Sequence, residues 1–179
     1  MNSQLLTLAE TQAEQVGYFD GLLVIRNGFI VAEDYYNGYD ENSPHNVKSV
    51  SKRFLSVIAG IAHHQGHIAD LDQKMLDYFP EYHQLNMDEN MGDVTIRHLL
   101  TMQMGIDSES EEGYALYQQV YRSANWIQTT LELPLVFDPG ENWRYNTLET
   151  HLLSAIITKA TGNTTLKYAQ DNMCRLMGI

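Results

Sequence analysis

The chain carries one strong β-hairpin signal near its start, and almost all of its remaining apolar pattern is helical. Residues 21–25 read Gly-Leu-Leu-Val-Ile, and the Asn27-Gly28 pair that follows is the dipeptide most typical of a two-residue hairpin turn. A second apolar run starts at Phe29, so residues 20–36 are predicted to form a β-hairpin. One hairpin followed by helices indicates an α+β protein and not a repeating strand–helix–strand unit.

Apolar residues at helical spacing occur on both sides of this hairpin. Residues 2–16 are predicted to form an amphipathic helix, and a second helix is expected from Ser49 to about Gly66, which would end it. The remaining predicted elements, in chain order, are a short helical piece over 71–79, a loop over 83–94, a helix capped by Thr95, a solvated acidic loop over 107–112, a long helix over 114–131, a turn over 137–140, and helices over 148–161 and 164–177.

Acidic residues outnumber basic ones, and this limits the classes of partner. Asp and Glu total 23 against 11 Lys and Arg, which gives a formal net charge of −12 over 179 residues. Such a surface repels phosphate backbones and anionic lipid, so nucleic acid is not an expected partner and a neutral or cationic substrate fits best. No apolar run approaches the ~20 residues needed to span a bilayer, so no membrane span is predicted.

The cellular compartment stays open. Cys174 is the only cysteine, so no internal disulfide can form, which fits a reducing compartment without excluding export. The first residues lack a basic segment and a long apolar run, so no signal peptide is predicted. The sequence fits the cytoplasm as it stands, and the periplasm or secretion if a leader has been removed.

The segment from Ser49 to Lys52 fits the S-x-x-K pattern. Residues three apart share one face of a helix, so the Lys52 amine can reach the Ser49 hydroxyl. A serine hydroxyl is a weak nucleophile until a base removes its proton, and a lysine can be that base where burial lowers its pKa. A helix N-terminus also directs backbone N–H groups toward a developing oxyanion. The motif therefore predicts a nucleophile and its proton-handling partner at the start of a buried helix.

Each of these residues also has a plainer interpretation. A serine three residues before a lysine arises by chance in many chains, with Ser49 as an N-cap and Lys52 in solvent. Ser51 is an alternative cap for the same helix. Tyr145 follows a Pro-Gly turn and precedes a helix, where a phenol near a lysine can relay a proton. Taken alone, it is one of eleven tyrosines and more simply packs its ring.

Several segments occur in an order typical of one superfamily. They are the hairpin start at 22–28, the S-x-x-K motif at 49–54, its helix and helix end at 60–68, the quite specific Val-Thr-Ile-Arg-His-Leu-Leu-Thr-Met stretch at 94–102, the turn and Trp-Arg-Tyr at 137–145, and the Thr-Gly pair at 161–162. Through them the chain resembles the serine β-lactamase and penicillin-binding-protein superfamily over about residues 17–179. The likeness is greatest to the class C β-lactamase-like branch, which includes esterases, D-amino-acid peptidases and amide hydrolases.

This resemblance implies a β-lactamase/transpeptidase-like fold and acyl-enzyme chemistry without a metal or organic cofactor. Ser49 would be acylated, Lys52 would be its base or proton partner, and Tyr145 would complete the relay. The family often shows Tyr-x-Asn, and here Thr147 stands where that asparagine would be, with Asn146 before it. Both are predicted to contact substrate, and the change favours a small ester or amide over a β-lactam.

Met104 is a further departure, because a serine is common at that position. Family members also continue beyond the position of Ile179, with the remaining central strands, a third motif of the Lys-Thr-Gly or His-x-Gly type and one oxyanion-hole N–H. Loss of one such donor costs roughly 100–1000-fold in turnover. The expectation is one incomplete domain over 1–179, with the N-terminal helix and hairpin over 1–48 and the helical subdomain over 49–179. The alternative is a non-catalytic fragment or interaction module that retains the motif.

The hairpin edge leads to an expectation about association. Unpaired N–H and C=O groups along an apolar strand form a template for another chain, and a two-stranded ribbon is marginal alone. We expect a homodimer, or pairing with a separately supplied C-terminal portion, through residues 20–36. A monomer in which residues 2–16 cover the hairpin is the alternative.

The remaining candidates receive structural interpretations. His63, His64 and His67 are close in sequence, but no acidic or cysteine ligands accompany them at metal-site spacing, so a solvated helix end is predicted and no metal. Trp126 and Trp143 are predicted to belong to the core and not to a binding surface.

Overall fold

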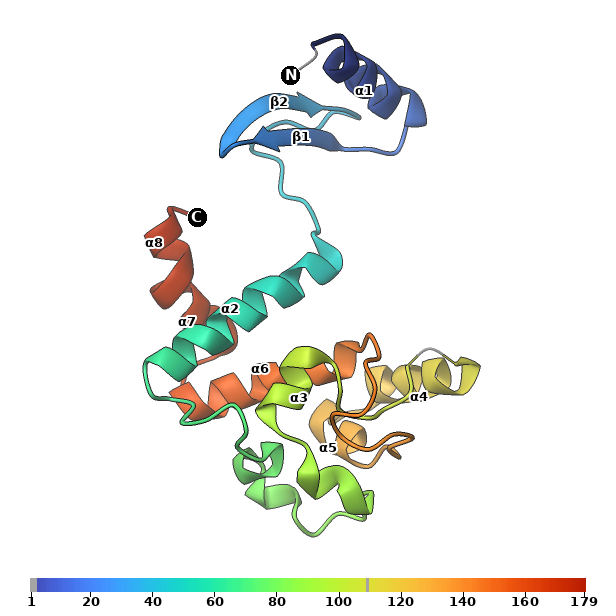
Figure 1. Cartoon of the computed structure of the whole chain (residues 1–179), viewed down its shortest axis with the longest axis vertical. Coiled ribbons are helices and arrows are strands. Elements are labelled where there is room, and N and C mark those ends of the chain that lie inside the picture. Colours follow the sequence, from blue (N-terminus) through green and yellow to red (C-terminus); the bar gives the residue numbers. More distant parts are fainter. Residues whose placement is uncertain (1–2, 109) are drawn as a thin grey trace. The chain divides into compact units, whose positions relative to one another are not determined.

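The predicted hairpin is confirmed in the computed structural model, which describes residues 3–108 and 110–179. β1 (Gly21–Arg26) and β2 (Phe29–Tyr35) pair antiparallel (Figure 1). Asn27 and Gly28 between them have φ values of 52° and 80°, as a type I′ turn requires. The pairing places Val24 opposite Ala32 and Ile25 opposite Ile30, so the strand β2 carries one extra residue, a β-bulge.

The hairpin belongs to the first of two units, Met1–Val47, and the second unit is Lys48–Ile179. In the first unit α1 (Ser3–Val16) buries Ala13, and the Tyr36 hydroxyl donates to the Glu10 carbonyl oxygen at 3.2 Å. Within the described residues the sheet consists of β1 and β2 alone. Large apolar side chains of the hairpin are exposed, namely Leu23, Ile25, Phe29 and Ile30.

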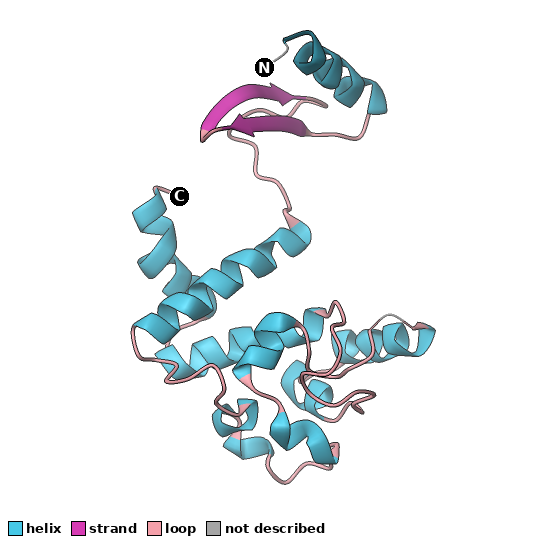
Figure 2. Cartoon of the chain, in the orientation of Figure 1, coloured by secondary structure: helices cyan, strands magenta, loops and turns pink. Residues whose placement is uncertain are grey.

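The second unit is built from helices, as Figure 2 shows. They are α2 (Ser51–His64), α3 (Ile96–Thr101), α4 (Glu111–Arg122), α5 (Trp126–Leu131), α6 (Thr147–Thr161), α7 (Thr165–Ala169) and α8 (Arg175–Met177), with 3-10 turns at Lys48–Val50, Met75–Tyr78, Pro80–Tyr82 and Glu89–Asp93 and a π-helical turn at Gln170–Cys174. The helix α6 is central, because α2, α3, α5 and α7 all pack against it. Among the described residues, no helix is long and apolar enough to cross a membrane.

Local capping chemistry explains several helix ends that the sequence predicts correctly. The Thr95 hydroxyl accepts from the His98 backbone N–H, and the His98 ring accepts from the Thr95 N–H, which completes a capping box. Gly162 follows α6 in the left-handed conformation, with φ of 68°. Leu152, Ile156 and Ile157 of α6 are fully buried or nearly so, as their spacing indicates.

Three predicted elements differ from the structure. The single helix over 114–131 is wrong, because Ser123 is extended and the Asn125 side chain caps a new helix, α5, by accepting from the Gln128 N–H at 3.1 Å. The loop over 83–94 contains the 3-10 turn Glu89–Asp93. The acidic loop is shorter than predicted, since α4 begins at Glu111, while Glu109 lies outside the described residues.

Candidate active site

The S-x-x-K motif lies where the 3-10 turn Lys48–Val50 runs into α2. Lys48 has a φ of 50°, and its carbonyl oxygen accepts a hydrogen bond from the Ser51 hydroxyl at 2.8 Å. The helix begins at Ser51, with Val50 as its N-cap and no side-chain cap bond. The interpretation of Ser49 as an N-cap is therefore wrong, and its hydroxyl is available for a different contact.

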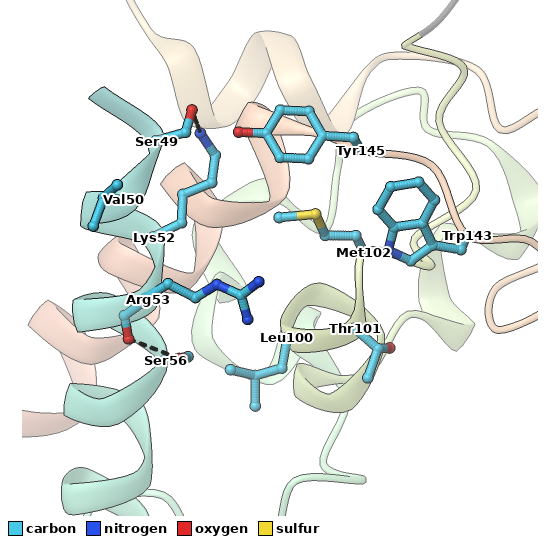
Figure 3. A pocket seen from close by; sticks show the side chains of 10 residues that line it. All are labelled: Ser49, Val50, Lys52, Arg53, Ser56, Leu100, Thr101, Met102, Trp143 and Tyr145. Carbon is cyan, nitrogen blue, oxygen red and sulfur yellow. Dashed lines mark hydrogen bonds between the residues drawn. The ribbon is translucent and has the colours of Figure 1, made fainter. Parts of the chain in front are cut away.

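That contact is with Lys52. The Lys52 amine donates to the Ser49 hydroxyl oxygen at 2.9 Å, and the same Nζ atom lies 5.1 Å from the centre of the Tyr145 ring. Figure 3 shows the Tyr145 hydroxyl directed toward this pair. The structure thus brings together the three residues that the family resemblance singles out. The helix that follows the motif buries its apolar face, as predicted, whereas Ser49 itself is exposed and Lys52 is half-buried.

Tyr145 has an altered acidity for a reason that the geometry explains. Hydrogen bonding to Ser49, and then to Lys52, lowers the pKa of the Tyr145 phenol below its usual value, and the nearby Lys52 charge acts in the same direction. Partial burial opposes this effect but does not outweigh it, since the residue is 42% exposed. A lowered pKa favours the phenolate, and a phenolate beside a serine hydroxyl can accept the serine proton.

Two polar contacts fix Tyr145 at the start of α6. The Ser108 hydroxyl donates to the Tyr145 carbonyl oxygen at 2.6 Å. The Asn146 side chain, which is only 2% exposed, caps α6 by accepting from the Leu148 N–H at 2.8 Å. Asn146 therefore has a capping contact, and neither it nor Thr147 is among the residues that line the cavity beside Ser49. Thr147 lines a neighbouring depression together with Lys52.

The loop before Tyr145 is held against the end of α3. The Gly140 N–H donates to the Gln103 carbonyl oxygen at 2.8 Å, and the Arg144 N–H donates to the Met102 carbonyl oxygen at 3.0 Å. Gly140 has a φ of 91°, and a Cβ atom there would lie 3.0 Å from the His98 Nε2 atom. A glycine is thus required at this turn for its backbone conformation and for its close approach to α3.

Glu149 on α6 is a buried carboxyl that the sequence analysis missed. It is 0% exposed; its Oε2 accepts from the Met104 N–H at 3.4 Å, while Oε1 has no hydrogen-bond partner among the described residues. Burial raises the pKa of Glu149 to about 9, so this group carries its proton at neutral pH. The sequence signal that could have revealed it is its position in the helix predicted over 148–161. Glu149 lies four residues before Leu153, on the apolar face of that helix.

A cavity of about 640 Å³ opens beside Ser49. Its lining residues, drawn in Figure 3, are Ser49, Val50, Lys52, Arg53, Ser56, Leu100, Thr101, Met102, Trp143 and Tyr145. Trp143 is 56% exposed at the cavity, so the prediction that it is a core residue is wrong. Trp143 lies in the loop that leads to Tyr145, between α5 and α6, and not on the buried face of a helix. Trp126 packs against the core, as predicted.

The clustered histidines have structural contacts. His63 Nδ1 lies 2.8 Å from the Ile68 carbonyl oxygen, and the His67 ring packs edge-on against Tyr168. Among the described residues, no group of three or more His, Cys, Asp or Glu is arranged to hold a metal ion.

Comparison with known proteins identifies the family of this chain. The Beta-lactamase family model matches residues 11–179, which is almost the whole chain. The chain belongs to the β-lactamase family. Its fold is accordingly that of the serine β-lactamases and transpeptidases, rich in helices and with a two-stranded antiparallel hairpin.

Proteins similar to this β-lactamase-family chain are named as hydrolases and as an acyltransferase. The chain is 24% identical over 159 residues to a monacolin J acid methylbutanoyltransferase of Aspergillus terreus, covering 77% of this chain and 37% of that protein. It superposes on EstCE1, a hydrolase with promiscuous acyltransferase activity, with a TM-score of 0.76 and 19% identity. The superposition covers 99% of this chain and 51% of EstCE1. On the D-alanine carboxypeptidase AmpC of Burkholderia cenocepacia it superposes with a TM-score of 0.69 and 17% identity, covering 98% of this chain and 48% of that protein. The chain thus spans between about a third and half of these relatives' length.

Proposed function

We propose that this chain carries the acylating centre of a serine hydrolase that acts on small esters or amides through an acyl-enzyme on Ser49. The supporting observation is the contact of Lys52 Nζ with Ser49 Oγ at 2.9 Å beside the Tyr145 hydroxyl. This arrangement supplies a nucleophile, a cation and a proton acceptor in one cavity. The family membership and the names of the similar proteins are consistent with this class of reaction.

In the proposed reaction, Ser49 Oγ attacks the substrate carbonyl carbon while its proton passes to the Tyr145–Lys52 pair. The lowered pKa of Tyr145 supports the phenolate as the acceptor, because Lys52 stabilises the negative charge of the phenolate before it takes the proton. The tetrahedral intermediate then collapses, and the alcohol or amine leaves with the proton that the pair returns. The acyl group stays bonded to Ser49 Oγ until an acceptor removes it.

Water is the simplest acceptor, because the Ser49 hydroxyl lies at an exposed position. A second alcohol can take the acyl group in the same way, which is the acyltransferase outcome that the names of two similar proteins describe. Both outcomes share the acyl-enzyme, so the first step is the one to test.

The test is covalent labelling. A fluorophosphonate should phosphonylate Ser49, with a new P–O bond and loss of fluoride, and intact-mass measurement followed by peptide mapping should find one adduct there. Ser49→Ala should abolish the adduct. Ser56→Ala is the matched control, because Ser56 lines the same cavity while its hydroxyl donates to the Arg53 carbonyl oxygen.

The competing proposal is a non-catalytic fragment or interaction module that retains the motif. A well-folded sample that gives no Ser49 adduct with a fluorophosphonate or an activated ester would favour it. An adduct that survives Ser49→Ala would instead show that another residue is the nucleophile.

A further inference from the structure

Arg53 follows Lys52 directly on α2 and also lines the cavity. In Figure 3 its guanidinium extends toward the interior of the cavity, on the side of Leu100 and Met102. The proposed acylation chemistry gives this side chain no task. Its position raises the question of what a second cation does beside the nucleophile.

The charge of the cavity is opposite to the charge of the chain. Its lining residues include two cations, Lys52 and Arg53, and no Asp or Glu, although acidic residues exceed basic ones by 23 to 11 over the sequence. Some other cations have acidic partners, as Arg97 has in Asp72 at 2.6 Å. Within the described part of the chain, Arg53 has no such ion pair. A local positive site of this kind attracts anions even where the molecule as a whole does not.

The distance from the nucleophile limits what this cation can bind. Arg53 comes four residues after Ser49, which is about one helical turn or roughly 6 Å along the axis. The cavity that holds Ser49 and Arg53 is also lined by apolar surface from Leu100, Met102 and Trp143. This combination suits a short methylene chain that ends in an anion.

We propose that Arg53 binds a carboxylate at the far end of the substrate's acyl group, so that the site prefers esters and amides of dicarboxylic acids. The proposal rests on the acyl-enzyme at Ser49. A guanidinium offers paired N–H donors that match the two oxygens of a carboxylate, which a lysine does not. The acyl group is chosen over the leaving group because it stays bonded to Ser49 after the first step, four residues before Arg53 in the chain.

The kinetic test compares two esters that differ only in charge, 4-nitrophenyl hydrogen adipate and its neutral methyl ester. The anionic ester should acylate Ser49 faster than the neutral ester. Arg53→Leu should lower the ratio of the anionic to the neutral rate roughly tenfold, because one charge-assisted hydrogen bond at an open site is lost. Arg53→Lys should retain part of the preference. Arg122→Leu removes an equal charge from α4, outside the cavity, and should leave the ratio unchanged.

A binding test separates this proposal from the proposed function. In the Ser49→Ala background, monomethyl adipate should perturb the Arg53 side-chain Nε–H resonance in an NMR titration, whereas dimethyl adipate should not, and Arg53→Leu should weaken binding of the anion. Arg53-dependent binding in this background, together with no acylation of the protein that retains Ser49, would support the carboxylate site and contradict the hydrolase. Acylation with equal rates for both esters, or a preference that survives Arg53→Leu, would overturn the carboxylate site and leave the hydrolase standing.

Discussion

The Glu149 carboxyl on α6 accepts a hydrogen bond from the backbone N–H of Met104, two residues after the cavity residue Met102. A group buried at 0% exposure thus connects the helix that carries Tyr145 at its start with the segment that forms one wall of the cavity. Burial keeps the proton on Glu149 although this hydrogen bond by itself favours the ionised form, because an ionised carboxylate at this place would lack solvation.

We expect the stability of the protein to fall as the pH rises from about 4.5, the ordinary value for glutamate, to about 9, the pKa of Glu149 in the folded state. In this window the folded state keeps a proton that the unfolded state loses, so each pH unit costs up to about 1.4 kcal/mol. Glu149→Gln should remove this contribution. Urea unfolding at several pH values measures the slope of the free energy of unfolding against pH for the unaltered protein and for Glu149→Gln. Equal slopes in the two proteins would contradict the raised pKa of Glu149.

Lys52→Ala and Tyr145→Phe should each slow the acylation of Ser49 by roughly 100–10,000-fold, the range for removal of a general base. The double variant should be little slower than the slower single variant, because residues of one relay act as a unit. Rapid-mixing release of 4-nitrophenol measures the single-turnover rates. Lys159→Ala is the control, since that amine pairs with Glu81 outside the cavity. Losses that multiply would indicate independent roles.

Gly140→Ala should destabilise the second unit by more than the ~1 kcal/mol expected for an alanine at positive φ, because the new methyl group also meets His98. The change should slow acylation as well, by displacing the loop before Tyr145. Gly38→Ala is the matched control, since Gly38 has a φ of 81° with open space around its Cβ position. Thermal unfolding of both variants checks the prediction, and equal losses would show that the His98 contact has no effect.

The hairpin should associate with another chain through a strand edge, as the sequence analysis predicts. Within the described residues β1 and β2 have no further strand partners, and Ile25 and Phe29 are exposed at 61% and 73%. Light scattering at micromolar concentration should show a concentration-dependent dimer, and Ile25→Lys should weaken it. A stable monomer whose hairpin amides are protected from hydrogen exchange would contradict association.

Features that depend on a few neighbouring residues could be predicted from the sequence. The Asn27-Gly28 turn, the Thr95 cap and the Gly162 helix end all follow from local backbone chemistry, and the structure confirms each of them. The meeting of Tyr145 with Ser49 and Lys52, by contrast, joins positions almost a hundred residues apart. It was expected only through the family resemblance, because no local pattern encodes such a distance.

The misses have a common physical origin in tertiary packing. Trp143 is apolar and was assigned to the core, but its place in the loop before Tyr145 exposes it at the cavity. Glu149 is an ionisable residue type and was passed over, yet its place on α6 among buried leucines and isoleucines buries it. The break between α4 and α5 was missed because the apolar residues on both sides of it keep a helical spacing, although Asn125 is a residue type that favours caps.

The start of α2 shows a compromise between robustness and reactivity. A helix whose N-cap is Val50 forgoes about 1 kcal/mol that a serine, asparagine or aspartate side chain would provide there. The same omission leaves the first backbone N–H groups of α2 without a competing side-chain oxygen, next to Ser49. Thermostabilising substitutions at Val50 would therefore place a rival acceptor, or a negative charge, where an oxyanion would need those donors. Directed evolution for heat resistance should avoid this position if catalysis is to survive.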